Sequence, residues 1–298
     1  MFDFRYHALS LAAVLIALVV GLLLGAAIGD NSIFSSAERS KLDQADKSLG
    51  QAQAADAALS GDLALREQYE GDVYPTIVAD ELVGERIGLI FLGQDNNQID
   101  QYVHSALAPS GAQVEFDAVV REPLELSEIA SALASVPGAS GYANLASDPA
   151  LLAPFAEKAA KALVSEPDGG ALIRAVEPSL FSSYVGGFGA VGAIVLVRND
   201  GSLPATAIAQ TAAFERAFAT GLVASGVVVA GVQLTDTAPS QVSWYSQQQL
   251  SSVNDVDDIA GRTALVYVLA GARGSYGIGS GVQSLLPSTL PTGASGKQ

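Results

Sequence analysis

The chain has 298 residues, of which 31 are acidic and 15 are basic, so its formal net charge is −16. It lacks cysteine, and its one methionine is the first residue. Disulfide frameworks, thiolate zinc sites, iron–sulfur clusters and cysteine nucleophiles are therefore excluded. The acidic balance argues against nucleic-acid binding, which requires a basic face. With 49% hydrophobic and 15% charged residues, the chain is not globally disordered.

The first predicted element is a transmembrane helix within residues 1–30. The run Ala8–Ile28 contains one polar residue, Ser10. A helix of this length measures about 31 Å, which is close to the hydrocarbon thickness of a bilayer. The apolar core of a secretory signal is shorter, about 7–15 residues. A weak cleavage pattern at residues 25–27 leaves removal of the segment as the alternative.

We expect the amino terminus in the cytoplasm and the bulk of the chain outside it, because the head before the apolar run is only seven residues long. The positive charges that flank the run are nearly balanced and do not decide the orientation. Small residues recur at every fourth position of the run, where they would let a second helix approach closely. They are Ala17, Gly21, Gly25 and Gly29.

Residues 31–72 predict a coiled-coil stalk. The pattern Ser35-Ser-Ala-Glu38 is typical of a helix-capping box. Apolar residues then recur at alternating steps of three and four, as in a heptad seam. The seam consists of Leu42, Ala45, Leu49, Ala52, Leu59 and Leu63. Because glycines and Asp56 interrupt it, an amphipathic helix lying on its own domain is the alternative. The seam does not tell whether its partner is a second copy or a different coiled-coil protein.

Residues 73–286 predict a Rossmann-like α/β domain with a mainly parallel sheet, because strand patterns alternate with helical patterns. The almost unbroken apolar run Arg86–Leu92 suits a strand covered on both faces. Further strands are expected at Gln113–Val120, Ala171–Val176, Ala190–Val197, Val227–Val232 and Thr263–Leu269. Helices are expected at Asn97–Ala108, Glu125–Ala134, Pro149–Val164 and Ala205–Ser225. Two lobes meeting near residues 199–201 are the alternative, and residues 287–298 predict a disordered tail.

Two glycine-rich motifs do not fit nucleotide binding. Gly187-x-Gly189-x-x-Gly192 matches the dinucleotide fingerprint, but the predicted strand follows the motif, whereas the fingerprint requires a strand before it. Gly277-x-Gly279-x-Gly281 follows a predicted strand, yet Pro287 comes too soon for a phosphate-facing helix. We interpret the second motif as a flexible turn or a partner-contact loop.

The remaining polar motifs do not indicate catalysis. The run Asn254–Asp258 is out of register with an EF-hand, so a solvated turn whose acids cap the next segment is favoured over a weak cation site. His104 is the one histidine of the globular part, and no nucleophile elbow accompanies it, so we interpret it as structural. The sequence predicts no catalytic residue, no cofactor and no metal site.

Two stretches carry a family resemblance. They are FRYHALSLAAVLIALVVGLLLGAAIGD at the start of the chain, and LSSVNDVDDIAGRTALVYVL at residues 250–269 together with Tyr276-Gly277. They resemble the actinobacterial MctB family of copper transport proteins, which has SteB as its corynebacterial relative, and the resemblance runs from end to end. Residues 253–257 depart from the family pattern, with Val-Asn-Asp-Val-Asp in place of Val-Asp-Asn-Val-Asp.

The resemblance implies two different roles and assigns no functional residue. One role is copper efflux or pore formation at the outer membrane. The other is a SteB-like role, in which a cell-envelope protein pairs with a SteA-like coiled-coil membrane protein and influences septal peptidoglycan hydrolysis during cell separation.

The ligand chemistry of the chain favours the second role. Cu(I) prefers thiolate and thioether ligands, and imidazole suits Cu(II); beyond the predicted anchor the chain offers one histidine and no sulfur ligand. We therefore do not expect direct copper coordination, and copper enters by family resemblance only. We expect a non-enzymatic, single-pass protein of the cell membrane, with an outer-membrane location as the alternative. Its partners are the lipid bilayer and either a SteA-like protein or a second copy, and not nucleic acid.

Overall fold

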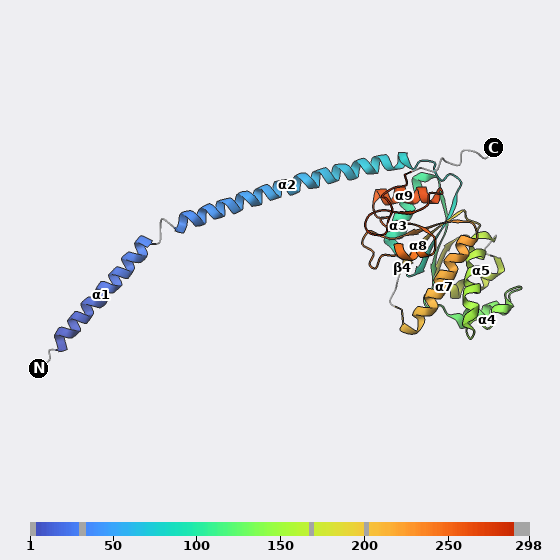
Figure 1. Ribbon diagram of the computed structural model, residues 1–298, viewed down its shortest axis with the longest axis horizontal. Helices are drawn as coiled ribbons and strands as arrows, with labels where there is room; N and C mark the ends of the chain where they lie inside the picture. Colours follow the sequence, from blue (N-terminus) through green and yellow to red (C-terminus); the bar gives the residue numbers. More distant parts are fainter. Residues whose placement is uncertain (1–3, 30–33, 167–169, 200–202, 289–298) are drawn as a thin grey trace. The chain divides into compact units, whose positions relative to one another are not determined.

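The computed structural model describes residues 4–29, 34–166, 170–199 and 203–288 (Figure 1). The chain divides into two structural units, residues 1–69 and residues 70–298. The first unit contains the helix α1 (Phe4–Gly29) and most of the helix α2 (Phe34–Ile77). The second contains the end of α2 and all strands of the described residues. The side chains of the predicted capping box, residues 35–38, lie outside the described side chains. The part of the predicted tail beyond residue 288 lies outside the described residues.

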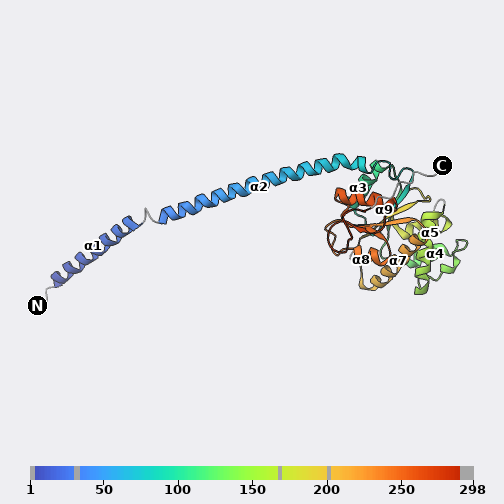
Figure 2. The ribbon, with the colours of Figure 1, turned by 45° about the horizontal axis from the view of Figure 1, so that its top comes forward.

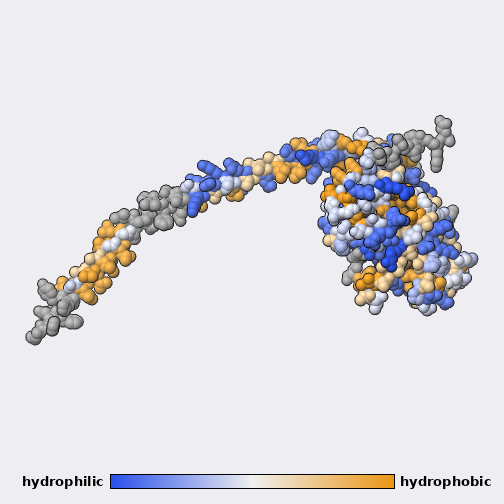
Figure 3. Space-filling view, in the orientation of Figure 1, coloured by the Kyte–Doolittle hydropathy of each residue, from blue (hydrophilic) through white to orange (hydrophobic). Residues whose placement is uncertain are grey.

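The two helices of the first unit are both exposed but differ in polarity. In α1 the described side chains are apolar except that of Ser10, and Figure 3 shows apolar surface along that part of the helix. In α2 every side chain from Ser40 to Asp72 is exposed, and polar residues alternate with leucine and alanine. The last turn of α2 includes Pro75 and leads into the second unit, where Tyr74 is buried.

The expected transmembrane helix is not found. Among the residues that the structure describes, no helix is long and apolar enough to cross a bilayer. The prediction of a membrane span at Ala8–Ile28 is therefore wrong, and the fold class is corrected to α/β with a mixed sheet and a Rossmann-like core.

The second unit is built on one sheet, in which the described residues place seven strands in the order β3-β2-β1-β4-β5-β6-β7. The strands are β1 (Arg86–Gly93), β2 (Gln113–Val120), β3 (Phe181–Gly186), β4 (Ala193–Asn199), β5 (Val228–Val232), β6 (Ser251–Val253) and β7 (Ser275–Tyr276). All neighbouring strands pair in parallel except β2 and β3, which run antiparallel. The strand order reverses between β1 and β4, the place where Rossmann-like sheets open a crevice.

Helices cover both faces of this sheet. On one face lie α3 (Asn97–Leu107) and α9 (Ile259–Leu269), which contact each other, and on the other lie α4 (Leu126–Leu133), α5 (Leu152–Ser165), α6 (Gly170–Leu180) and α7 (Ala205–Ala224) (Figures 1 and 2). A short helix, α8 (Val242–Gln247), precedes β6. Alternate residues of β1 and β4 enter the two separate apolar cores, which explains their unbroken apolar sequences.

Two predicted strands are helices in the structure. Residues 171–176 belong to α6, and residues 263–269 belong to α9, in which every residue from Thr263 to Leu269 is buried. An apolar run without a polar face fits a buried strand and a buried helix equally well, and in both cases tertiary packing selects the helix. The strands β3, β6 and β7 were not predicted, because they are short and rich in serine.

Candidate functional site

The predicted seam residues all lie on α2 and are exposed. Leu42, Leu49, Leu59 and Leu63 expose between 48% and 64% of their surface, and Ala45 and Ala52 are exposed as well. A helix normally turns its apolar stripe towards other protein atoms. The seam is therefore available to a partner helix, and its pairing stays a prediction.

The predicted packing stripe of small residues lies on α1. A side chain added at Gly21 or Gly25 would meet no atom within 4 Å, and Ala17 is exposed. Gly29 lies outside the described side chains. The use of this stripe for helix packing stays a prediction.

A cluster of two carboxylates and one imidazole lies where α3 faces β2. Asp100 and His104 are one turn apart on α3, and His104 Nε2 lies 3.6 Å from Asp100 Oδ1. Asp117 reaches the same imidazole from β2, with its Oδ2 3.4 Å from His104 Nε2. In the described part of the chain, these three residues are the one group whose potential metal-ligand atoms lie within 4.8 Å of one another. We call them the Asp–His–Asp cluster.

The backbone around the cluster is well anchored. The Asn96 side chain caps α3 by accepting hydrogen bonds from the backbone N–H groups of Gln98 and Ile99, at 3.0 and 3.1 Å. Asp117 lies on β2 directly opposite Leu89 of β1. A capped helix and a paired strand hold their side chains more precisely than loops do.

A cleft of about 220 Å³ adjoins the cluster. Its floor includes apolar residues of β1, β2 and β3, and its rim is acidic and polar. The lining residues are Phe91, Asp95, Asn96, Asn97, Asp100, Asp117, Val119, Ser183 and Val185. No basic side chain lines the cleft, so it suits a cation better than an anion.

Asp117 is the electrostatically unusual member of the cluster. Its Oδ1 is buried and has no hydrogen-bond partner. Loss of hydration raises the pKa of this carboxyl above its usual value, the His104 charge opposes the shift, and Asp100 adds to it. A bound cation would relieve both the unsatisfied oxygen and the repulsion between the two aspartates.

The cluster is not arranged for nucleophilic catalysis. Within the described residues, His104 forms no hydrogen bond with a serine or threonine hydroxyl, and its two recorded partners are carboxylates. A triad needs the imidazole within hydrogen-bond reach of the nucleophile. The arrangement instead resembles a ligand set for a metal ion, with two oxygens and one nitrogen donor.

The glycine motifs and the acidic run fall on loops. Gly187, Gly189 and Gly192 lie between β3 and β4, so a strand follows this motif as predicted. The strand β3, which was not predicted, also ends directly before the motif, and the motif departs from the fingerprint because β4 and not a helix follows it. Within the acidic run, Asp258 caps α9 by accepting a hydrogen bond from the backbone N–H of Ala260 at 2.8 Å, which agrees with the capping interpretation.

Asp255 in the same run is fully buried, and neither carboxylate oxygen bonds another residue. Gly261 and Gly277 lie so close to it that a side chain at either position would overlap its atoms. Burial, and secondarily the charges of Asp258 and Asp257, raises the pKa of Asp255 to about 6. The expectation of a solvated turn is therefore wrong for Asn254 and Asp255, which are both buried. The sequence shows the acidic run but not which of its members are enclosed.

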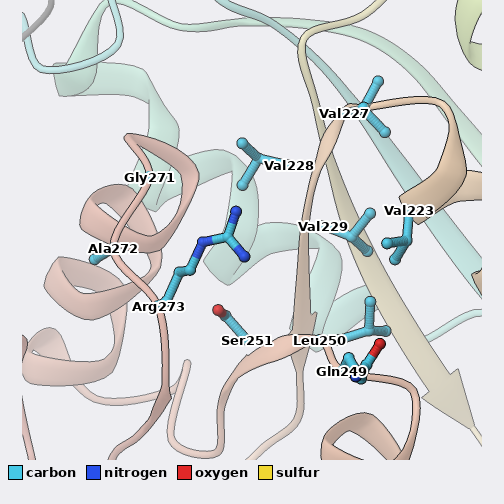
Figure 4. Close-up of a pocket in the computed structure, with 11 residues that line it drawn as sticks. Val223, Val227, Val228, Val229, Gln249, Leu250, Ser251, Gly271, Ala272 and Arg273 are labelled. Atoms are coloured by element: carbon cyan, nitrogen blue, oxygen red, sulfur yellow. The ribbon is translucent and has the colours of Figure 1, made fainter.

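A second hollow lies at the opposite, amino-terminal edge of the sheet (Figure 4). It measures about 190 Å³ and is lined mainly by valine and leucine from β5, the end of α7 and the segment before β6. Arg273 is its one charged residue. Sequence reasoning missed this hollow, because its residues come from three separate segments, 223–229, 249–251 and 271–273.

One family comparison covers nearly all of the chain. The family model described as copper transport outer membrane protein, MctB, matches residues 1–287. No curated protein matches the chain. The matched range includes both the leucine seam of α2 and the Asp–His–Asp cluster.

Proposed function

Because the chain belongs to the MctB family, we propose that it is a non-enzymatic protein of the cell envelope that docks onto protein partners through α2 and its α/β domain. The family description relates its members to copper transport and to the outer membrane. The resemblance to SteB supports cell separation as the process and a SteA-like coiled-coil protein as the partner, with a second copy of the chain as the other choice.

The observation that supports docking is the exposure of the α2 seam. Four leucines at heptad spacing are at least 48% exposed in the single chain. Burying one leucine side chain contributes about 1.5–3 kcal/mol, and isolated helices are marginal in water without such packing. A partner helix packed on this seam would therefore stabilise α2, and the positions of the leucines would fix how the two helices align.

Single-cysteine crosslinking in intact cells tests the proposal, because the natural chain contains no cysteine. Leu49→Cys lies in the seam, and Lys47→Cys on the opposite helix face is the matched control. We expect Leu49→Cys to crosslink to a defined partner and Lys47→Cys to crosslink much less. Equal crosslinking of both variants, or none, would count against a paired α2.

The crosslinked species also identifies the partner. A product of twice the chain mass indicates a second copy, and a product containing another coiled-coil protein indicates a heteromeric stalk. Changing Leu42, Leu49, Leu59 and Leu63 together to aspartate should abolish recovery of either partner. Unchanged recovery would contradict the proposal.

A second candidate function is direct handling of copper, which the Asp–His–Asp cluster favours. Its donors are one imidazole nitrogen and carboxylate oxygens, which suit Cu(II) rather than Cu(I). The ligand atoms lie within 4.8 Å of one another, so small side-chain movements would bring them to one ion. In this role copper is the cargo, and Asp100, His104 and Asp117 would hold it beside the acidic cleft.

Electron paramagnetic resonance with Cu(II) tests this second candidate, because the chain has only two histidines. We expect a nitrogen-coordinated Cu(II) spectrum that persists in His7→Gln and disappears in His104→Gln. Asp117→Asn should weaken binding at least tenfold in a titration. A spectrum that survives His104→Gln, or a wild-type chain that gives only aqueous Cu(II), would remove copper binding at the cluster.

A further inference from the structure

The hollow at the amino-terminal edge of the sheet combines an apolar wall with one charged group (Figure 4). Val229 and Leu250 are each only 6% exposed and form the deepest part of the wall. Val223, Val227 and Val228 continue it, and Gln249 and Ser251 lie at its edge. A concave apolar surface with a few fixed polar groups is the usual form of a small-molecule site.

Arg273 is placed over this hollow by a well-bonded loop between α9 and β7. The backbone N–H of Ala272 donates to Tyr267 O at 2.9 Å, and Tyr276 Oη donates to Arg273 O at 2.7 Å. The next N–H, that of Gly274, donates to Ser251 Oγ at 3.2 Å. Figure 4 shows the Arg273 side chain extending from this loop across the hollow towards Val228.

The Arg273 guanidinium has no counter-ion in the described part of the chain, where no carboxylate lies within 4 Å of it. Three other arginines do have carboxylate partners: Arg86 pairs with Glu115, Arg121 with Glu125 and Arg198 with Glu215. In a chain with twice as many acids as bases, an arginine left unpaired beside an apolar wall is a free recognition group. Its planar fork of donors matches a carboxylate in a bidentate manner.

We propose that this hollow binds a small branched aliphatic carboxylate, whose alkyl group packs on the valine and leucine wall while its carboxylate pairs with Arg273. The hollow measures about 190 Å³, which is below the about 300–1,000 Å³ of sites for drug-sized ligands, so its size selects a small ligand. The site is independent of the α2 seam and of the Asp–His–Asp cluster, which lies at a different part of the sheet.

Titration of the full chain with 4-methylpentanoate, followed by calorimetry or by chemical shifts, tests the proposal. The neutral amide of the same acid has the same shape without the charge. We expect saturable binding of the acid and at least tenfold weaker binding of the amide, because a charge-assisted pair is lost. Equal binding of both compounds, or no saturable binding of the acid, would overturn the proposal.

Variants separate recognition by Arg273 from a general effect of charge. Arg273→Gln should weaken binding of the acid at least tenfold and leave the weak binding of the amide unchanged. Arg216→Gln removes the same charge from α7 outside the hollow and should bind like the natural chain. Val228→Thr keeps the side-chain shape but replaces a methyl group with a hydroxyl. It should weaken the binding of both compounds several-fold.

Folding of each variant is checked by the fluorescence of Trp244, the single tryptophan of the chain. A folded Arg273→Gln protein that still binds the acid like the natural chain would overturn the proposal. Binding of a peptide through its terminal carboxylate in preference to the free acid would also overturn it, since the ligand would then be a macromolecule.

Discussion

Leucine has opposite surroundings in the two structural units. On α2 the seam leucines are about half exposed or more, whereas Leu89, Leu196 and Leu222 of the α/β domain are completely buried. The domain therefore draws its stability from its own core, and α2 has to draw much of its stability from a partner. The same substitution should consequently have different effects in the two units.

The largest difference is expected for Leu196→Ala against Leu49→Ala. Leu196 lies on the central strand β4 and is fully buried, so its truncation should lower the free energy of unfolding of the domain by about 2–5 kcal/mol. Leu49 lies on the exposed seam and should leave domain stability within about 0.5 kcal/mol. Urea unfolding followed by Trp244 fluorescence measures both values. Equal losses in the two variants would break the comparison.

A somewhat smaller effect is expected from the buried carboxyl of Asp255. An unfolded aspartate releases its proton near the ordinary value of 3.8, whereas the folded chain retains it to about pH 6. Between these values the folded state binds the additional proton, so domain stability should fall by about 2 kcal/mol as the pH rises from 4 to 6.

Asp255→Asn removes that titration. The variant should be more stable than the natural chain at pH 7 and should lose less stability between pH 4 and pH 6. Asp236→Asn, at an exposed position, is the control and should keep the natural slope. Identical pH profiles for Asp255→Asn and the natural chain would show that Asp255 is not enclosed as the structure has it.

The smallest effects are expected from two glycine substitutions of opposite sign. A side chain at Gly231 of β5 would overlap the Tyr245 ring, so Gly231→Ala should destabilise the domain by about 1–3 kcal/mol. Gly61 lies in the interior of α2 with open space around it, so Gly61→Ala should favour the helix by about 1 kcal/mol. Urea unfolding measures the first value, and circular dichroism of α2 during heating measures the second. A destabilising Gly61→Ala would indicate a close neighbour on that face.

The sequence predicted those strands and helices whose type follows from the spacing of apolar residues along a short stretch of chain. The apolar runs of β1, β4 and β5 were assigned correctly, because both of their faces are covered, and β2 was assigned correctly from its strand-like pattern. The runs at 171–176 and 263–269 were assigned wrongly, because a helix buried on all sides has no polar face to reveal its period. The expected membrane span was also wrong, and the serine-rich edge strands gave no apolar signal.

The candidate sites were less accessible to prediction, since they depend on contacts between distant segments. The spacing of Asp100 and His104 places both on one helix face and could have been noticed. Asp117 joins them only because β2 packs beside α3. No local sequence pattern predicts that this strand and this helix are neighbours. Nothing in the sequence distinguishes Arg273 from the other arginines. Only the fold brings it beside the apolar wall of the hollow.

The strand order also has a consequence for biosynthesis. The strand β1, which lies beside the central strand β4, is made early, but the sheet is complete only when β7 has been synthesised, almost at the end of the chain. Chains leave the ribosome amino terminus first, and long-range strand pairing is slower than local helix formation. The seam of α2 is thus ready to meet a neighbour while the domain behind it is still unfinished, and assembly can precede completion of the fold.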